Sequence, residues 1–288
     1  MFGTLTTPTE APAALECGSR SDLGRVRENN EDSVLVAPEL NLFVVSDGMG
    51  GLAAGELASR ITVEAILEYC RRADADPLVP LAGKSIEGVS EASNRLASAV
   101  RLANRAVHAA AAQDPTRRGM GATVVAVRFT DERVSIAHVG DSRAYRLRGE
   151  RLEQLTQDHS YIAEQVRRGL LSEQDAAQSN LQNVLIRALG VNPEVEVDIA
   201  EELVMEGDTI LLCSDGLARE LSDAQIAAVL RGADCAQQAA DRLVDFANQA
   251  GGGDNITAVV LRQGAKTTGL LGQIGRLGKR FKGPRNSF

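Results

Sequence analysis

Three apolar segments of this chain end in the same way, at an aspartate flanked by small residues, and this pattern constrains the fold more than any other feature. The aspartates are Asp47, Asp141 and Asp215, at the ends of segments 42–48, 136–142 and 210–216. A fourth, Asp254, follows three glycines and precedes the apolar run that begins at Ile256. Short apolar runs bounded by turn residues predict buried strands, so the four carboxylates are expected at strand ends.

Carboxylates clustered at the ends of buried strands repel one another, and the cluster is unfavourable unless a cation offsets the repulsion. Oxygen ligands select hard ions such as Mg²⁺ or Mn²⁺. Zinc and copper sites use pairs of His and Cys, which this sequence lacks. A turn is the better interpretation of any single Asp-Gly pair. Four such aspartates together favour a divalent metal site.

The rest of the pattern predicts an α+β sandwich. Strands are expected at 42–46, 122–129, 133–139, 143–147, 195–199, 209–214 and 256–262, and helices at 56–70, at 90–112 and from near Ser172 and Ser222. Ser222 and Gln225 have the spacing of a capping box, which marks a helix start. Segments 122–129 and 133–139 are joined by too few residues for a helical crossover, so they predict an antiparallel hairpin.

The chain has 288 residues, of which 44% are hydrophobic, and this is enough for one large domain or two small ones. Residues 1–15 are rich in Thr, Pro and Ala and predict a disordered N-terminal extension. Residues 265–288 form a basic C-terminal tail that contains six Lys and Arg residues and no acid. The folded domain is therefore expected over residues 16–264.

Charge and cysteine content limit the function classes. A formal net charge of −8 argues against nucleic-acid binding, which needs basic patches. The four cysteines have no spacing typical of a zinc site or a disulfide framework, and they fit a reducing compartment. The first residues lack the pattern of a signal peptide, and no apolar stretch is long enough to span a bilayer. We therefore expect a cytoplasmic protein.

Two interpretations of the basic tail stay open. Leu270, Ile274, Leu277 and Phe281 have helical spacing beside basic residues, which is typical of a segment that contacts a membrane surface or an acidic partner. Glycines at 269, 272, 275 and 278 oppose a helix, because each costs about 1 kcal/mol. The alternative is a flexible, solvated tail.

Six short motifs occur in order along the chain. They are Ser21–Asp32, Ser46–Gly51 (SDGMGG), Gly119–Thr123 (GMGAT), Val139–Arg143 (VGDSR), Ser214–Gly216 (SDG) and Gly253–Thr257 (GDNIT). Together they resemble the bacterial branch of the metal-dependent protein phosphatases, the protein phosphatase 2C family. Each motif alone is a weak signal, whereas the ordered set, which covers residues 16–262, is a specific one.

The resemblance implies a four-layer αββα sandwich of two antiparallel sheets flanked by helices, with a flap subdomain at about residues 156–190. It implies two Mn²⁺ or Mg²⁺ ions at one end of the sheets. The implied metal ligands are Asp47 as the bridge between the ions, the Gly48 carbonyl, Asp215 and Asp254, with Asp32 close by. Asp141 and Asp215 are implied for a third, weaker ion.

The activity implied by the resemblance is hydrolysis of phosphoserine and phosphothreonine in other proteins, by a water that bridges two ions. Arg27 and Asp47 are the expected catalytic residues, and the planar fork of Arg27 suits a phosphate. Met49 stands where animal relatives carry a histidine thought to act as general acid, so the leaving group must take its proton from water or another residue. The expected partners are phosphorylated proteins, including a cognate Ser/Thr kinase and its substrates, and we expect a monomer.

Rival interpretations remain. A pseudophosphatase would dock phosphoproteins without metals, although every implied ligand is present. The glycine-rich segment 48–53 formally fits a dinucleotide-binding fingerprint of an oxidoreductase, but Asp47 beside it would repel a pyrophosphate. Gly83–Ser85 fits the end of a P-loop, yet Leu78 occupies the place of its first glycine.

The three histidines are expected to be structural. His138 lies within a predicted strand and should belong to the core. His108 should lie on a helix, as a surface or packing residue. His159 stands at the start of the flap, where a structural role is favoured over a contact with substrate. The flap itself is inserted between two strands that carry implied metal ligands, so we expect it to shape recognition of the phosphoprotein.

Overall fold

The computed structural model describes residues 15–51, 54–130, 132–176, 179, 181 and 184–264. The predictions for the N-terminal extension, except its last residue, and for the basic tail concern residues 1–14 and 265–288, which lie outside the described residues. Among the helices that are described, none is long and apolar enough to cross a membrane.

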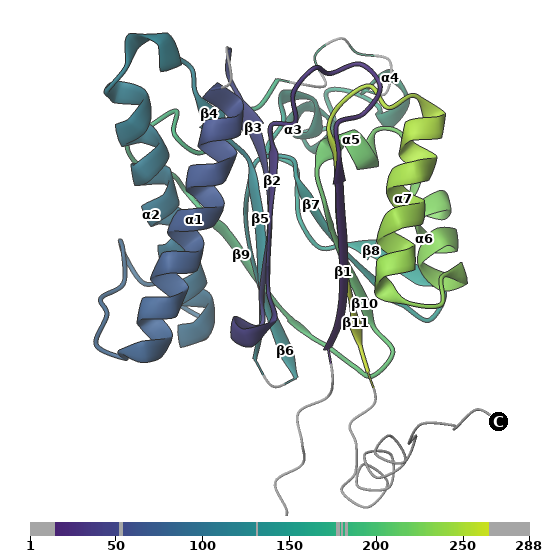
Figure 1. The fold of residues 1–288 in the computed structure, drawn as a ribbon, viewed down its shortest axis with the longest axis horizontal. Helices are drawn as coiled ribbons and strands as arrows, with labels where there is room; N and C mark the ends of the chain where they lie inside the picture. Colours follow the sequence, from purple (N-terminus) through teal and green to yellow (C-terminus); the bar gives the residue numbers. More distant parts are fainter. Residues whose placement is uncertain are drawn as a thin grey trace, which may run out of the picture.

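Two antiparallel sheets face each other in the middle of the molecule (Figure 1). One sheet has the strand order β1 (Leu15–Asp22), β11 (Ile256–Gln263), β10 (Thr209–Cys213), β7 (Arg143–Arg148) and β8 (Arg151–Gln154). The other has the order β2 (Asp32–Ala37), β3 (Leu42–Met49), β5 (Val124–Thr130), β6 (Arg133–Val139) and β9 (Asp198–Leu203), and the short β4 (Gly121–Ala122) pairs with the end of β3. The predicted hairpin is β5 and β6.

Helices cover the outer face of each sheet (Figure 1). On the β2–β9 sheet lie α1 (Ala54–Ala75) and α2 (Glu91–Ala112), and on the β1–β8 sheet lie α5 (Asp215–Ala218), α6 (Asp223–Gly232) and α7 (Ala236–Ala250). The connection from β8 to β9 contains α3 (Tyr161–Arg167) and α4 (Glu173–Ala176), and single 3-10 turns occur at Pro38–Leu40 and Pro115–Arg117. The four-layer αββα sandwich is confirmed.

Apolar residues on both faces of the central strands explain why these strands read as unbroken apolar runs. In β3, Phe43 and Val45 pack between the two sheets, whereas Val44 packs under α1 and α2. In β10, Leu212 packs between the sheets and Leu211 under α6 and α7. Strands buried on both faces are held rigidly, and so are the residues that follow them.

Several elements differ from the sequence prediction. The strand expected at 195–199 is β9, which begins at Asp198 and continues to Leu203, and the helix expected near Ser172 is the four-residue α4. Strands β1, β2 and β8 and helices α5 and α7 are additional. The strands of both sheets are antiparallel, so the dinucleotide-binding alternative, which requires a parallel sheet, is wrong.

The predicted capping box begins α6. The Ser222 side chain accepts a hydrogen bond from the Gln225 backbone N–H, and the Gln225 side chain accepts one from the Ser222 N–H at 2.9 Å. Ser222→Ala should therefore lower the free energy of unfolding by about 1 kcal/mol in urea titrations, whereas Ser222→Thr should keep most of it. Equal stabilities of the alanine and threonine variants would contradict this role for the cap.

Candidate metal centre

The predicted acidic residues stand where strands of both sheets finish or begin, at one end of the sandwich. Asp32 opens β2 and faces Asp47, near the end of β3, across the antiparallel register. Asp141 lies in the turn that leads from β6 of one sheet to β7 of the other. Asp215 follows β10 and opens α5, and Asp254 precedes β11. The structure thus brings all five carboxylates to the same end.

A cavity of about 200 Å³ opens among them. It is lined by Arg27, Glu31, Asp47, Gly48, Met49, Asp141, Asp215, Arg219, Asp254 and Asn255, among others. Asp32 is buried opposite Asp47. Its Oδ2 accepts hydrogen bonds from the hydroxyls of Ser214, at 2.8 Å, and Thr257, at 2.7 Å. These two hydroxyls come from the first sheet, so the Asp32 carboxylate also ties the sheets together.

Two carboxylate oxygens of this group are buried without a hydrogen-bond partner among the described residues, Asp32 Oδ1 and Asp215 Oδ1. A buried polar atom left unpaired costs about 1–3 kcal/mol, and more when it is charged. A divalent cation would satisfy such oxygens, and a set of ligands made only of oxygens suits Mg²⁺ or Mn²⁺. The residues present therefore fit the implied ions.

The electrostatics of the site agree with this fit. Burial, together with the charges of Asp215 and Asp254, raises the pKa of Asp32 to about 7, against the two hydroxyl hydrogen bonds, which lower it. Burial likewise raises the pKa of Asp141 to about 7. Burial and the neighbouring carboxylates hold the pKa of Asp47 well above its ordinary value. Without a cation, the group gains by binding protons, and a metal would replace them.

This predicts an unusual pH dependence for the metal-free protein. The folded pKa values of Asp32 and Asp141 lie above the unfolded values, so their contribution to stability is present below about pH 4 and is lost as the pH rises towards 7. In EDTA, the Tm should therefore fall as the pH is raised from 5 to 8. Added Mn²⁺ should raise the Tm by several degrees more at pH 8 than at pH 5. Asp141→Asn should flatten the slope of Tm against pH in EDTA. An unchanged slope in this variant would contradict a role of the Asp141 carboxyl in the pH dependence.

Arg27 reaches the cavity from the loop between β1 and β2. Its Nη2 lies 2.8 Å from Asp254 Oδ2, and its side chain is 46% exposed. Asn255 fixes this loop, because its side-chain amide donates to the carbonyls of Leu23 and Asn29 and its Oδ1 accepts from the Glu31 N–H. The guanidinium is therefore held at the cavity mouth with part of its surface open to solvent.

Gly48 lies where a side chain could not be placed. A Cβ atom there would come within 2.0 Å of the Gly55 carbonyl oxygen, at the start of α1. The Gly48 N–H donates to the Glu31 carbonyl at 3.0 Å, which joins β3 to the loop before β2. Met49, which follows, lines the cavity. Its thioether has no proton to donate.

The sequence patterns did not single out three residues of this cavity, Glu31, Asn255 and Arg219. Glu31 and Asn255 stand inside the motifs that carried the resemblance, but nothing in their spacing distinguished them from other polar loop residues. Arg219 had a usable signal. It follows Asp215 by four residues, which places the two side chains on the same face of a helix, and it forms ion pairs with Asp215 and Asp141.

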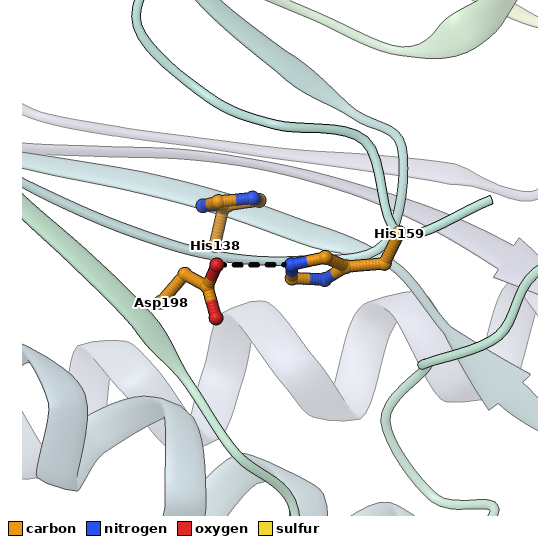
Figure 2. A group of neighbouring side chains, drawn as sticks. All are labelled: His138, His159 and Asp198. Carbon is orange, nitrogen blue, oxygen red and sulfur yellow. Dashed lines mark ion pairs between the residues drawn. The ribbon is translucent and has the colours of Figure 1, made fainter. Parts of the chain in front are cut away.

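A second polar cluster contains two of the histidines (Figure 2), and its residues do not line this cavity. His138 of β6 and His159 are both buried, as expected of structural residues, and their rings stack with centroids 4.6 Å apart. The Asp198 carboxylate of β9 points towards His159, with Oδ2 3.2 Å from Nε2. The pKa of Asp198 is held well below its ordinary value by the His159 hydrogen bond and by Arg187.

Only His138, His159 and Asp198, among the described residues, have three possible ligand atoms within 4.8 Å of one another, but their geometry opposes a metal site. His159 Nδ1 accepts a hydrogen bond from the Gly140 N–H, His138 Nε2 lies 2.8 Å from the Gln157 carbonyl, and Arg187 already pairs with Asp198. The two imidazole rings are stacked, so their nitrogen lone pairs lie in two nearly parallel planes and do not converge on one metal position. The cluster instead fastens both ends of the segment between β8 and β9 to β6 and β9.

The five aspartates converge less tightly than these three residues. This is the expected arrangement for a site with two ions, because the ligands are shared between ions that lie about 3.5–4 Å apart.

Comparison with known proteins gives a consistent result. The family described as Protein phosphatase 2C matches residues 25–250. The serine/threonine phosphatase stp of Listeria innocua is 34% identical over 247 residues, which cover 85% of this chain and 94% of that protein.

The solved structures that resemble the fold belong to proteins of the same kind. The crystal structure of the Mycobacterium tuberculosis serine/threonine phosphatase PstP/Ppp matches with a TM-score of 0.77 and 35% identity, over 87% of this chain and 99% of that one. The catalytic domain of PstP in complex with two manganese ions matches with a TM-score of 0.75 and 35% identity, over the same shares of the two chains.

Proposed function

The chain belongs to the protein phosphatase 2C family and is a protein phosphatase, and we propose that it hydrolyses phosphoserine and phosphothreonine in other proteins at the acidic cavity. The observation that carries this proposal is the gathering of five aspartates, two of them with unpaired buried oxygens, beside a partly exposed arginine. Acidic residues alone would repel a phosphorylated substrate, so the activity requires cations in the cavity.

We propose that this cavity would hold two ions, Mn²⁺ or Mg²⁺, with Asp47 as a ligand. The further ligands are the Gly48 carbonyl, Asp215 and Asp254, with Asp32 adjacent and Asp141 with Asp215 available to a third ion. The two manganese ions bound by the PstP catalytic domain support this assignment. When bound, such ions supply a water with a lowered pKa as nucleophile and offset the charge of the phosphoryl oxygens.

The protein itself holds and orients the substrate. The Arg27 guanidinium, placed at the cavity mouth by Asp254, offers a planar fork to two phosphate oxygens. The rigid strand ends keep the carboxylates in place, so no reorganisation is needed as charge develops. Because Met49 cannot donate a proton, the serine or threonine leaving group takes its proton from water or from another residue.

We further propose that segment 156–190 forms a flap that contacts the phosphoprotein. A second cavity, of about 760 Å³, lies against Ile162, Ala163 and Val166 around α3 and reaches Asp141 and Asp215. This placement would let the protein around a phosphoserine contact the flap. Deleting residues 160–185 should then reduce turnover of a phosphoprotein far more than turnover of a small aryl phosphate, and equal losses would contradict a role in recognition.

The proposals for the substrates, the oligomeric state and the cellular location rest on family membership and composition. We propose that the substrates include a cognate Ser/Thr kinase and its targets, and that the chain acts as a monomer in the cytoplasm, where its four free cysteines would remain reduced. For the basic tail we propose contact with anionic lipid or an acidic partner. A chain that ends at residue 264 should then bind anionic vesicles less than the full chain does.

The decisive experiment measures hydrolysis of an aryl phosphate and of a phosphothreonine peptide by the purified chain with Mn²⁺, Mg²⁺ or EDTA. We expect turnover that depends on the metal and is abolished by EDTA and by Asp215→Asn. A folded protein without turnover under any metal would instead indicate the pseudophosphatase.

A further inference from the structure

One side-chain cation lies between two carboxylates of the centre. Arg219 follows the short helix α5, whose first residue is Asp215. Its Nη2 forms an ion pair with Asp215 Oδ2 and lies 3.4 Å from Asp141 Oδ2. One guanidinium therefore bridges the carboxylate in the turn between β6 and β7 and the carboxylate that follows β10, and its side chain remains 28% exposed.

These two carboxylates are the pair that the resemblance implies for a third ion. A divalent ion bound to both oxygens would lie about 2.0–2.6 Å from each, in the space that the guanidinium nitrogen now takes. The Arg219 charge also lowers the pKa of both acids, against the larger rise caused by their burial. In electrostatic terms the arginine acts as a cation at this position, and it cannot remain there together with a metal.

Arg219 has space into which it can move. It lines both the cavity of about 200 Å³, with the metal-centre residues, and the cavity of about 760 Å³ beside α3. In the larger cavity the neighbouring acid, Asp158, already pairs with Arg143, so no described carboxylate there competes strongly for the displaced guanidinium. If an ion displaced the Arg219 guanidinium, the guanidinium would lose its two ion pairs and become hydrated.

We propose that Arg219 is a built-in competitor of the third divalent ion for Asp141 and Asp215. The chain then acts with two ions while Arg219 is in place, and a third ion binds only when it displaces the guanidinium. The inference rests on the proposed function, because it concerns the occupancy of the same centre. It adds a residue of this chain that sets the affinity for one ion without holding any ion itself.

The test counts bound Mn²⁺ by the EPR signal of the free ion, across a titration of the full chain. In the wild type, two tight sites and a weak third one are expected. Arg219→Ala and Arg219→Gln should each tighten the third site by about tenfold or more, and adding Asp141→Asn to Arg219→Ala should remove that gain. Arg167→Ala is the matched control. Arg167 lines the same larger cavity but pairs with Glu164, so this variant should leave the Mn²⁺ affinities unchanged.

Two results would overturn the inference. One is an unchanged third affinity in both Arg219 variants whose Tm shows that they are folded. The other is an increase in KM for an aryl phosphate without any change in Mn²⁺ binding, which would make Arg219 a contact of the substrate phosphate. A wild type that binds no Mn²⁺ would overturn the proposed function itself, so the two failures are distinguishable.

Discussion

Asp47→Asn should lower turnover by on the order of 10³ or more and, at the same time, make the metal-free protein more stable. The loss of turnover follows from the role of Asp47 as a ligand that would hold the ions we propose for the cavity. The gain in stability follows from electrostatics, because Asp47 faces Asp32 in the strand register and lies near Asp141 and Asp215. Asparagine keeps the size of the side chain and removes one of the repelling charges.

Two measurements check this prediction. Turnover of an aryl phosphate with Mn²⁺ should collapse, and urea unfolding in EDTA at pH 8 should shift to higher urea concentration, by about 1.4 kcal/mol for each pKa unit of repulsion removed. Asp234→Asn is the matched control, since Asp234 is exposed and forms no ion pair with the described residues. A variant that is less stable in EDTA than the wild type would show that the Asp47 charge is compensated within the protein.

The sequence predicted those parts of the fold and site that are encoded in short, regular patterns. Asp47, Asp141 and Asp215 end apolar runs that are buried on both faces, so the runs identified both the strands and the positions of the acids. The β5–β6 hairpin followed from the length of its connection. The family resemblance implied that these acids meet at one end of the sheets, and the structure places them there.

Asp32 could be assigned only through the family resemblance, because its own strand was not predicted. Strand β2 lies at the edge of its sheet and is only six residues long, with intermediate burial at Ser33–Val36. Strand β1 likewise contains many polar residues and forms no apolar run. Its partner is β11, at the other end of the chain. Pairing over such a separation leaves no local pattern, since it depends on the closure of the whole sheet.

Local sequence patterns could not predict the ion pairs of Arg219 or the histidine cluster, for a similar reason. Arg219 meets Asp141 across 78 residues, where the turn after β6 approaches α5. His138 stacks on His159 because the chain returns to β6 after passing through two strands of the other sheet. Such contacts follow from how the sheets pack, and so they require the structure.

Arg27→Ala should lower kcat/KM for a phosphothreonine peptide by about 10² or more without weakening Mn²⁺ binding. A charge-assisted hydrogen bond to a phosphate contributes about 1.5–3 kcal/mol, and the Arg27 fork can make two. Arg27→Lys should retain part of the activity, because an ammonium keeps the charge and loses the planar pair of donors. Since the Arg27 guanidinium pairs with Asp254, its removal leaves that carboxylate free for a metal, so the affinity for Mn²⁺ should stay equal or rise.

The control for this prediction is Arg25→Ala, which removes the same charge two residues away. Arg25 is exposed and holds the loop through its backbone N–H, which donates to the Gly252 carbonyl at 2.7 Å and is kept in the variant. If Arg27 binds the phosphate directly, the loss in kcat/KM should be confined to the Arg27 variants, and each of these variants should bind Mn²⁺ at least as tightly as the wild type does. Equal losses in both alanine variants would mean that the arginines act through the overall field of the cavity, because a general field depends on charge and not on the position of one donor fork.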